Sequence, residues 1–222
     1  MFIKMVIKVL ELFSGYGGAS FALKKANIEH ICIGYSDIES CANYIFALNH
    51  GENIPQLGDI TKINPNELED FDLLTGGFPC QSFSAIGKRE GFESKDKGNL
   101  FFEIIRIAEV KKPRYMLLEN VQGLLNHDDG ETMKRCLEEI KKIGYYVHWK
   151  LIKSFELGTP QNRPSVWFTC FKNINNHIKV MFHKKEKIQF GYEKLLEKKI
   201  DEKYFINKEN KMVNFDIVEC FW

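Results

Sequence analysis

Short apolar runs alternate with helical stretches from residue 5 to residue 171, and this alternation limits the possible folds more than any other feature of the chain. Apolar runs bounded by turn residues are typical of buried strands. We predict strands at 5–12, 31–36, 55–58, 72–76, 114–119, 145–153 and 165–171. We predict helices at 17–27, 38–50, 99–110 and 130–143. The expected fold is α/β, built from parallel βαβ units.

Length and composition indicate one main domain with a buried core, because 222 residues with 44% hydrophobic side chains are ordinary for a globular protein. A net charge of +1 gives no global attraction to nucleic acid. The six cysteines form no CxxC pair, which favours reduced thiols in a cytoplasmic protein. Residues 1–10 are interrupted by lysines and read as the first strand, and no run reaches membrane-spanning length.

The character of the chain changes after Phe171. Residues 172–222 are rich in Lys, Asn and Glu, and their apolar residues lose a clear period. We therefore expect a catalytic or binding domain over 1–171 and a connector, or the start of another module, over 172–222.

A glycine-rich turn, Phe13 to Gly18, joins the first predicted strand to the first predicted helix. Glycines let a ligand approach the backbone, and the helix behind them offers amide donors. About twenty residues on, Asp37 and Glu39 end the second strand, where an acid can bind a ribose diol. Asp59 ends the third strand in the same row. The turn alone fits an ordinary α/β protein as well as a nucleoside site.

A cysteine and a glutamate end two further strands. Cys80 follows Pro79 after a pair of glycines, and Glu119 ends the apolar run that begins at Tyr115. A thiol at a strand end is a candidate nucleophile, and a neighbouring carboxylate is a candidate acid or base. Either residue alone is more often structural, so the two together carry the prediction.

These motifs together resemble the C5-cytosine methyltransferase family, which methylates cytosine in DNA with S-adenosylmethionine (AdoMet). The matching segments are 13–18 (FSGYGG), 58–61 (GDIT), 77–84 (GFPCQSFS), 98–102 (GNLFF), 119–121 (ENV) and 158–163 (GTPQNR), in the family's order. The resemblance implies the Rossmann-like AdoMet-dependent methyltransferase fold, with a mostly parallel seven-stranded sheet, an antiparallel strand and helices on both faces. It also implies that 172–222 begins, or leads to, a target-recognition region.

By this resemblance, Cys80 adds to carbon 6 of a flipped cytosine and Glu119 binds the ring N3 and exocyclic amine. Arg163 is the third implied catalytic residue. No metal is required. The implied substrate contacts are Gln81, Ser84, Asn120 and Gln161. The polar, glycine-containing segment 81–98 fits a closing lid.

The resemblance implies a cofactor site for AdoMet around the glycine-rich turn. Phe13 would stack on adenine, Asp37 would bind the ribose, and Asp59 would lie at the adenine edge. The implied cofactor residues are Phe13, Gly15, Gly17, Gly18, Asp37, Ile38, Asp59, Ile60, Pro79 and Leu100. Asp37 stands where the family more often has glutamate, so Glu39 is a second candidate for the ribose.

Two departures from the family pattern leave alternatives open. Ser165 stands where the family usually has a second arginine, and the chain ends at Trp222, before a target-recognition domain. We expect the catalytic part of a split or truncated restriction-modification enzyme, with double-stranded DNA as its partner and a second subunit as a further candidate partner. In a bacterium it would be nucleoid-associated. The alternatives are a tRNA cytosine-5 methyltransferase and a noncatalytic binding remnant.

Overall fold

A computed structural model describes residues 6–79 and 100–172 of the chain. These residues form two compact units. The first contains the described residues up to Lys153 and from Pro164 onward, and the second contains Ser154–Arg163.

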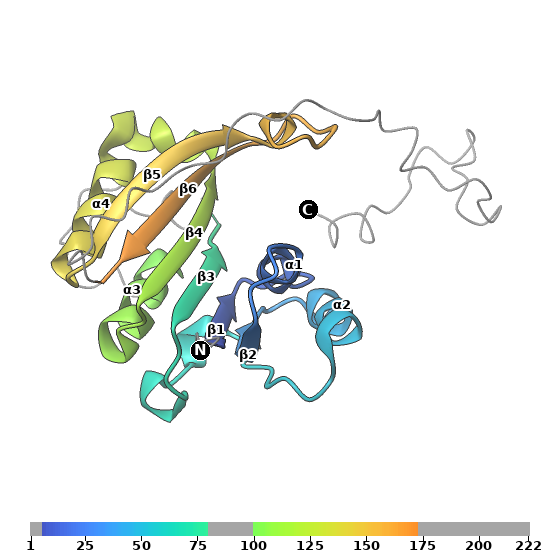
Figure 1. Ribbon diagram of the computed structural model, residues 1–222. Coiled ribbons are helices and arrows are strands. Elements are labelled where there is room, and N and C mark those ends of the chain that lie inside the picture. The colour runs from blue at the N-terminus through green and yellow to red at the C-terminus, as the bar shows by residue number, and fades with distance from the viewer. Residues whose placement is uncertain (1–5, 80–99, 173–222) are drawn as a thin grey trace, which may run out of the picture. The chain divides into compact units, whose positions relative to one another are not determined.

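The first unit is built on a six-stranded sheet with the order β2-β1-β3-β4-β6-β5 (Figure 1). Its strands are β1 (Ile7–Leu12), β2 (His30–Ser36), β3 (Leu73–Gly77), β4 (Tyr115–Val121), β5 (Tyr146–Lys153) and β6 (Pro164–Phe171). β1, β2, β3 and β4 pair in parallel, whereas β6 is antiparallel to both β4 and β5. The predicted parallel sheet with one antiparallel strand is confirmed.

The prediction of a seventh strand at 55–58 is wrong for the described residues, because the segment forms only an isolated bridge between Tyr35 and Gln56. Tyr35 N–H donates to Pro55 O at 3.0 Å, and Leu57 N–H donates to Tyr35 O at 2.8 Å. Pro55 has no N–H to donate, and Gly58 turns the chain with a φ of 66°. The proline and the glycine together confine the pairing to one position.

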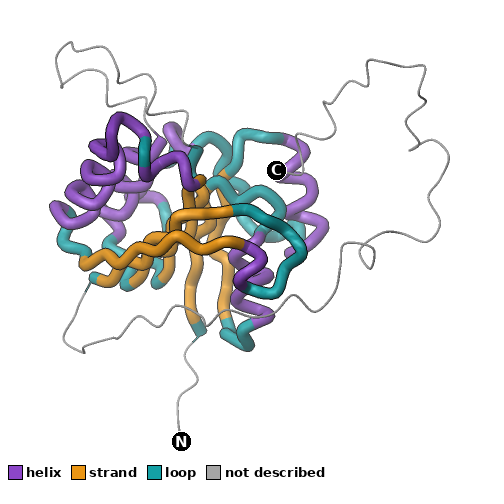
Figure 2. The backbone as a smooth tube through the Cα atoms, turned by 90° about the horizontal axis from the view of Figure 1, so that it is seen from above, coloured by secondary structure: helices purple, strands orange, loops and turns teal. Residues whose placement is uncertain are grey.

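Helices cover both faces of the sheet, as Figure 2 shows from above. They are α1 (Gly18–Lys25), α2 (Ser40–His50), α3 (Leu100–Lys111) and α4 (Glu131–Lys142). On β1, Leu10 and Leu12 belong to the core shared with α3 and α4, whereas Glu11 between them bonds to Ser20 of α1. This is the two-residue alternation of a strand. None of the described helices is long and apolar enough to cross a bilayer.

The main core lies between the sheet and the α3 and α4 helices. α3 presents Phe101, Ile104, Ile105 and Ala108 at the spacing of one helical face, and all four are buried. The strands supply most of the remaining core side chains: Leu10, Leu12, Leu74, Met116, Leu118, Val166, Phe168 and Cys170. On the opposite side, Tyr35 of β2 stacks on Phe46 of α2 with ring centroids 3.8 Å apart.

Arg106 of α3 ties the segment after Asp59 to the core layer. Its Nη1 donates to Ile63 O at 2.8 Å and its Nη2 to Ile60 O at 3.1 Å. Its Nε donates to Glu103 at 2.7 Å. A planar guanidinium can serve three acceptors at once, so one side chain fixes both ends of the turn 60–63.

Candidate active site

The glycine-rich turn follows β1 directly, and two of its glycines have backbone conformations that favour glycine. The φ angles are 52° at Gly15 and 86° at Gly17. Gly17 N–H donates to Ser14 O at 2.9 Å, which closes the turn before α1. A Cβ on Gly17 would lie 2.1 Å from His50 Nε2, whereas one on Gly15 would meet nothing within 4 Å. Gly17 therefore packs against α2, and Gly15 borders open space.

Asp37 holds this turn in place. Its Oδ2 accepts Gly15 N–H at 2.9 Å, and its Oδ1 accepts Glu39 N–H at 3.0 Å. The short aspartate side chain thus links the turn after β1 to the start of α2. Glu39 is exposed, and its backbone begins α2 without a side-chain cap. The structure therefore brings Gly15, Asp37 and Glu39 together at the carboxyl ends of neighbouring strands.

Asp59 lies beside this pair of strand ends. Ser36 Oγ donates to Gly58 O at 2.6 Å, so the residues next to Asp37 and Asp59 in sequence are bonded. Thr61 donates its N–H and hydroxyl to Asp59 Oδ1, which lowers the pKa of Asp59 and keeps it ionised. The side chain of Ile60 is 3% exposed and packs in the core, so it anchors the turn that follows Asp59.

Phe13 and Ile38 are the two apolar side chains predicted to border the base. Phe13 has a φ of 51°, a conformation that costs a bulky residue about 1–3 kcal/mol and that concentrates at functional sites. Its Cδ2 would lie 3.7 Å from a Cβ on Gly76, so the ring lies against the end of β3. Ile38 is 73% exposed, which leaves its side chain accessible for a ligand.

The end of β3 leads to the predicted nucleophile. Pro79 is exposed and is the last described residue before the segment 80–99, which the structure does not describe. Leu100 is the first described residue after that segment, where it begins α3 and is half-buried against the core. The predicted site residues Cys80, Gln81 and Ser84 lie outside the described residues, as does the whole predicted lid segment 81–98.

Glu119 lies on β4, directly beside β3, the last strand before Cys80 in the sequence. In the β3 and β4 ladder, Gly77 and Glu119 are paired. A Cβ on Gly77 would lie 3.4 Å from Glu119 Oε2, so the carboxylate covers the bare Cα of Gly77. Cys80 follows three residues later in the sequence. Glu119 therefore lies beside the strand end from which the chain continues toward Cys80, which is outside the described residues.

Asn120 has a different environment from the predicted substrate contact. Its side chain is 1% exposed. Nδ2 donates to Phe78 O at 2.9 Å, and Oδ1 accepts Val121 N–H at 2.8 Å. Both ends of the amide are thus bonded to backbone, and the side chain joins β4 to the segment that precedes Cys80.

Gln161 and Arg163 lie in the second compact unit, both exposed. Arg163 O accepts from Ser154 N–H at 3.0 Å and from Ser154 Oγ at 2.9 Å, which closes the loop 154–163. Gln161 N–H donates to Thr159 O at 2.8 Å. In the first unit, Ser165 is 6% exposed and pairs with Val121 in the ladder.

Glu11 is a site residue to which the sequence analysis assigned no role. Its side chain is 1% exposed, and its Oε1 accepts the N–H and the hydroxyl of Ser20, in the first turn of α1. Burial raises the pKa of Glu11, and the bonds from Ser20 oppose that shift in part. The sequence signal was a lone carboxylate within the apolar strand 7–12. Glu11 caps α1 from behind the glycine-rich turn.

We expect Glu11→Gln to become more stable relative to the wild type as pH rises. A carboxyl whose pKa is raised by folding contributes stability below its ordinary value of 4.5, and loses it as pH rises through the folded value. Glutamine lacks that titration. Urea unfolding of both proteins at about pH 5 and about pH 8 measures the difference. The exposed Glu52→Gln is the control and should show no trend. A pH-independent difference for Glu11→Gln would refute the assignment.

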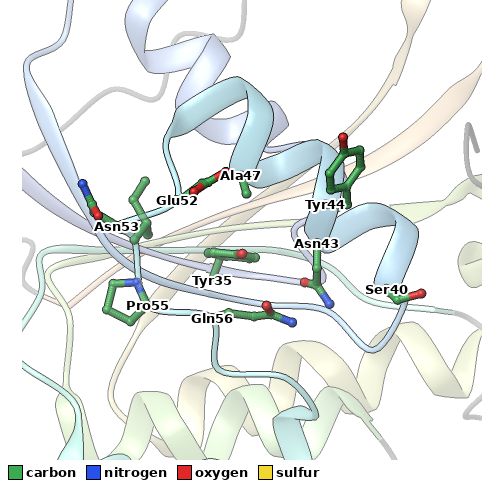
Figure 3. Close-up of a pocket in the computed structure, with 10 residues that line it drawn as sticks. Tyr35, Ser40, Asn43, Tyr44, Ala47, Glu52, Asn53, Pro55 and Gln56 are labelled. Carbon is green, nitrogen blue, oxygen red and sulfur yellow. The ribbon is translucent and has the colours of Figure 1, made fainter.

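A hollow of about 610 Å³ lies between α2 and the segment 52–56 (Figure 3). Its lining includes Tyr35, Asn43, Tyr44 and Gln56 but none of the predicted cofactor residues. Asn43 connects the two regions, because its Nδ2 donates to Asp37 O at 3.1 Å. The hollow is therefore next to the glycine-rich turn and distinct from it.

Comparison with known proteins identifies close relatives. The profile of the family described as C-5 cytosine-specific DNA methylase matches residues 7–219. The chain is 42% identical over 173 residues to the type II methyltransferase M.MspI of a Moraxella species, covering 77% of this chain and 40% of M.MspI. It is 36% identical over 178 residues to M.HhaI of Haemophilus parahaemolyticus, covering 80% of this chain and 53% of that protein. The match thus spans about half the length, or less, of these relatives.

A solved structure shares the fold. The Dnmt2 methyltransferase of S. pombe aligns with a TM-score of 0.69 and 26% identity, over 88% of this chain and 62% of that one. The six-stranded sheet, the family match over most of the chain and the identity to curated relatives agree. The chain belongs to the C-5 cytosine-specific DNA methylase family.

Proposed function

We propose that this chain is the catalytic portion of a DNA (cytosine-5-)-methyltransferase, which transfers a methyl group from AdoMet to carbon 5 of a cytosine flipped out of double-stranded DNA. The observation that carries the proposal is the position of Glu119 against Gly77, at the end of the strand that leads to Cys80. Because Cys80 follows Gly77 by only three residues in the sequence, we infer that the Glu119 carboxylate and the Cys80 thiol act on the same ring.

Carbon 5 of cytosine becomes nucleophilic only when a group adds to carbon 6. In the proposed reaction the Cys80 thiolate forms that bond, and Glu119 stabilises the charge at N3 through a hydrogen bond. With AdoMet bound, carbon 5 of the resulting enamine would accept the methyl group as the bond between that methyl and the sulfonium sulfur breaks, and S-adenosylhomocysteine would leave. Loss of the carbon 5 proton to a base and departure of Cys80 as thiolate restore the aromatic ring. Arg163 is proposed to favour the thiolate form of Cys80, and its replacement by alanine would then raise the pKa of that thiol.

The residues of the first unit fit AdoMet. Gly15 borders open space, and Asp37, Glu39 and Asp59 place carboxylates around the same end of the sheet, where α/β folds bind nucleosides. Phe13 and Ile38 supply apolar surface for the base, with Gly17, Gly18, Ile60, Pro79 and Leu100 completing the proposed set. Because Asp37 already binds the turn, Glu39 is proposed to share the ribose. When bound, AdoMet supplies an electrophilic methyl group.

Target recognition is proposed to come from chain beyond the catalytic portion, in residues from 172 onward or in a second subunit. The support is length, since the match covers only 40–53% of M.MspI and M.HhaI. We propose a cytoplasmic restriction-modification enzyme with DNA as its substrate.

Methyl transfer from labelled AdoMet tests the function. The chain is assayed alone, and with any protein encoded beside it, on mixed-sequence DNA and on tRNA, with Cys80→Ala as control. We expect label on DNA that the Cys80→Ala variant loses. Label on tRNA alone would move the activity to RNA, and no transfer together with no AdoMet binding would refute an enzymatic role.

A further inference from the structure

The carbonyl of Tyr16, inside the glycine-rich turn, accepts two side-chain donors from the end of α2. Asn49 Nδ2 lies 3.1 Å from Tyr16 O, and His50 Nε2 lies 3.2 Å from the same oxygen. A carbonyl oxygen has two lone pairs and only accepts, so it can take both bonds, and the bond from His50 requires a hydrogen on Nε2. Both bonds are tertiary contacts between the end of a helix and a turn 33 or 34 residues earlier.

Packing fixes the His50 ring in the position that its bond needs. The ring lies between Phe21 of α1 and Phe46 of α2, with centroids 4.6 Å and 4.8 Å away. Gly17 follows Tyr16, and a Cβ on Gly17 would overlap His50 Nε2. The absence of a side chain at position 17 therefore leaves the space through which the imidazole reaches the Tyr16 carbonyl.

The residues at the two ends of α2 thus hold the glycine-rich turn together. Before the helix, Asp37 Oδ2 accepts Gly15 N–H at 2.9 Å, and at its end Asn49 and His50 hold Tyr16 O. These bonds fix one peptide group on each side of the pair 15–16. Gly15 borders open space, so the turn gains no packing from a side chain there. A turn that is already fixed loses less freedom when a ligand binds.

We propose that Asn49 and His50 are positioning residues for the glycine-rich turn, acting through the Tyr16 carbonyl rather than through contact with AdoMet. This inference rests on the proposed AdoMet site at that turn. The two bonds keep the turn in its binding conformation before the cofactor arrives. Both donors share one oxygen, so either one bonds more strongly when the other is removed. Loss of one donor is therefore tolerated, whereas loss of both releases the turn.

Amide hydrogen exchange without AdoMet, followed residue by residue by NMR, provides the first test. Asn49→Ala removes one donor, and His50→Phe removes the other while keeping an aromatic ring. Loss of two ordinary hydrogen bonds changes an opening equilibrium by about thirtyfold. We expect the Gly17 amide, which donates to Ser14 O, to exchange less than about threefold faster in each single variant and about thirtyfold faster in the double variant. That increase exceeds the product of the single effects, which is the mark of two coupled residues.

Three further variants control for a general loss of structure. His50→Gln, combined with Asn49→Ala, places an amide nitrogen close to the position of Nε2 and should restore slow exchange at Gly17. His30→Phe removes a histidine that also bonds a backbone carbonyl, at 3.0 Å, but at the amino end of β2. Asn66→Ala removes an exposed asparagine whose side chain bonds within 64–66. Both of these variants should match the wild type.

The amides of β1 report whether the effect is local. They should exchange at the wild-type rate in every variant, because a released turn leaves the sheet paired. Unchanged Gly17 exchange in the folded double variant would overturn the proposal, as would an equal acceleration in β1. If His50→Phe fails to fold by circular dichroism, His50→Leu replaces it in both variants. If that also fails, Asn49→Ala decides, since Asn49 is exposed, and wild-type exchange at Gly17 in that variant would overturn the proposal.

Affinity and turnover separate this role from catalysis. The apparent affinity for AdoMet falls with the fraction of protein whose turn is closed. We expect the double variant to raise the Kd for AdoMet, measured by calorimetry, and its KM by about threefold or more, with kcat at saturating AdoMet within about twofold of the wild type. A lowered kcat with unchanged KM for AdoMet would overturn the proposal. A wild type that binds no AdoMet would refute the proposed function, whereas Gly17 exchange would still test the hold on the turn.

Discussion

Replacing Glu119 with glutamine should reduce methyl transfer by about 10²–10³-fold while leaving the fold intact. Glutamine has nearly the same shape, so the pairing of residue 119 with Gly77 is retained. It cannot, however, supply the proton or the charge that the proposed hydrogen bond to cytosine N3 requires. Single-turnover rates with labelled AdoMet, under conditions where the wild type is active, measure the loss.

Two variants make this result specific. Glu119→Asp keeps the carboxylate but draws it back from the Gly77 Cα, and should lie between glutamine and the wild type. Glu109→Gln changes an exposed carboxylate on α3 and should match the wild type. Wild-type kcat in Glu119→Gln would exclude Glu119 from the chemistry.

Replacing Gly17 with alanine should lower the free energy of unfolding by about 2–4 kcal/mol. Its φ of 86° costs any other residue about 1–2 kcal/mol, and its Cβ would lie 2.1 Å from His50 Nε2. The His50 ring cannot easily move aside, because it packs between Phe21 and Phe46 with centroids 4.6 Å and 4.8 Å away. Urea unfolding measures the change, and calorimetric titration with AdoMet should show weakened binding.

Gly15→Ala is the matched control for Gly17→Ala. Gly15 has a φ of 52° in the same turn, but a Cβ there meets nothing within 4 Å. It should therefore show only the backbone cost, with reduced AdoMet affinity because the new methyl group enters the proposed cofactor space. Equal stability losses in the two variants would show that the contact between Gly17 and His50 has no energetic importance.

Most of the fold could be predicted from local sequence pattern. Within the described residues, each of the six strands and four α-helices lies within about two residues of its predicted bounds, because apolar runs and glycine turns are local signals. The segment 55–58 was the exception. Its apolar residues fit a strand, but Pro55 and Gly58 restrict backbone pairing at both ends of the segment. This restriction depends on how the segment is placed against Tyr35, which the local sequence does not specify.

The sequence predicted which residues lie near one another at the site better than it predicted the hydrogen bonds between them. Sequence order placed Gly15 and Asp37 at neighbouring strand ends, and the structure joins them directly. The sequence did not predict that both carboxylate oxygens of Asp37 accept backbone N–H groups. It also did not predict that the Asn120 side chain donates to the Phe78 carbonyl. Such bonds depend on side-chain direction and on register across strands, which no local pattern specifies.

The hydrogen bonds of Arg106 determine which residues near Asp59 can change in sequence without altering the backbone. Its guanidinium recognises the carbonyls of Ile60 and Ile63, which every residue type possesses, and not their side chains. The shape of the turn beside Asp59 is thus encoded on a helix more than forty residues away. The exposed positions of that turn, such as Lys62, can accept substitutions without altering the geometry, whereas a lysine at 106 could not span both carbonyls.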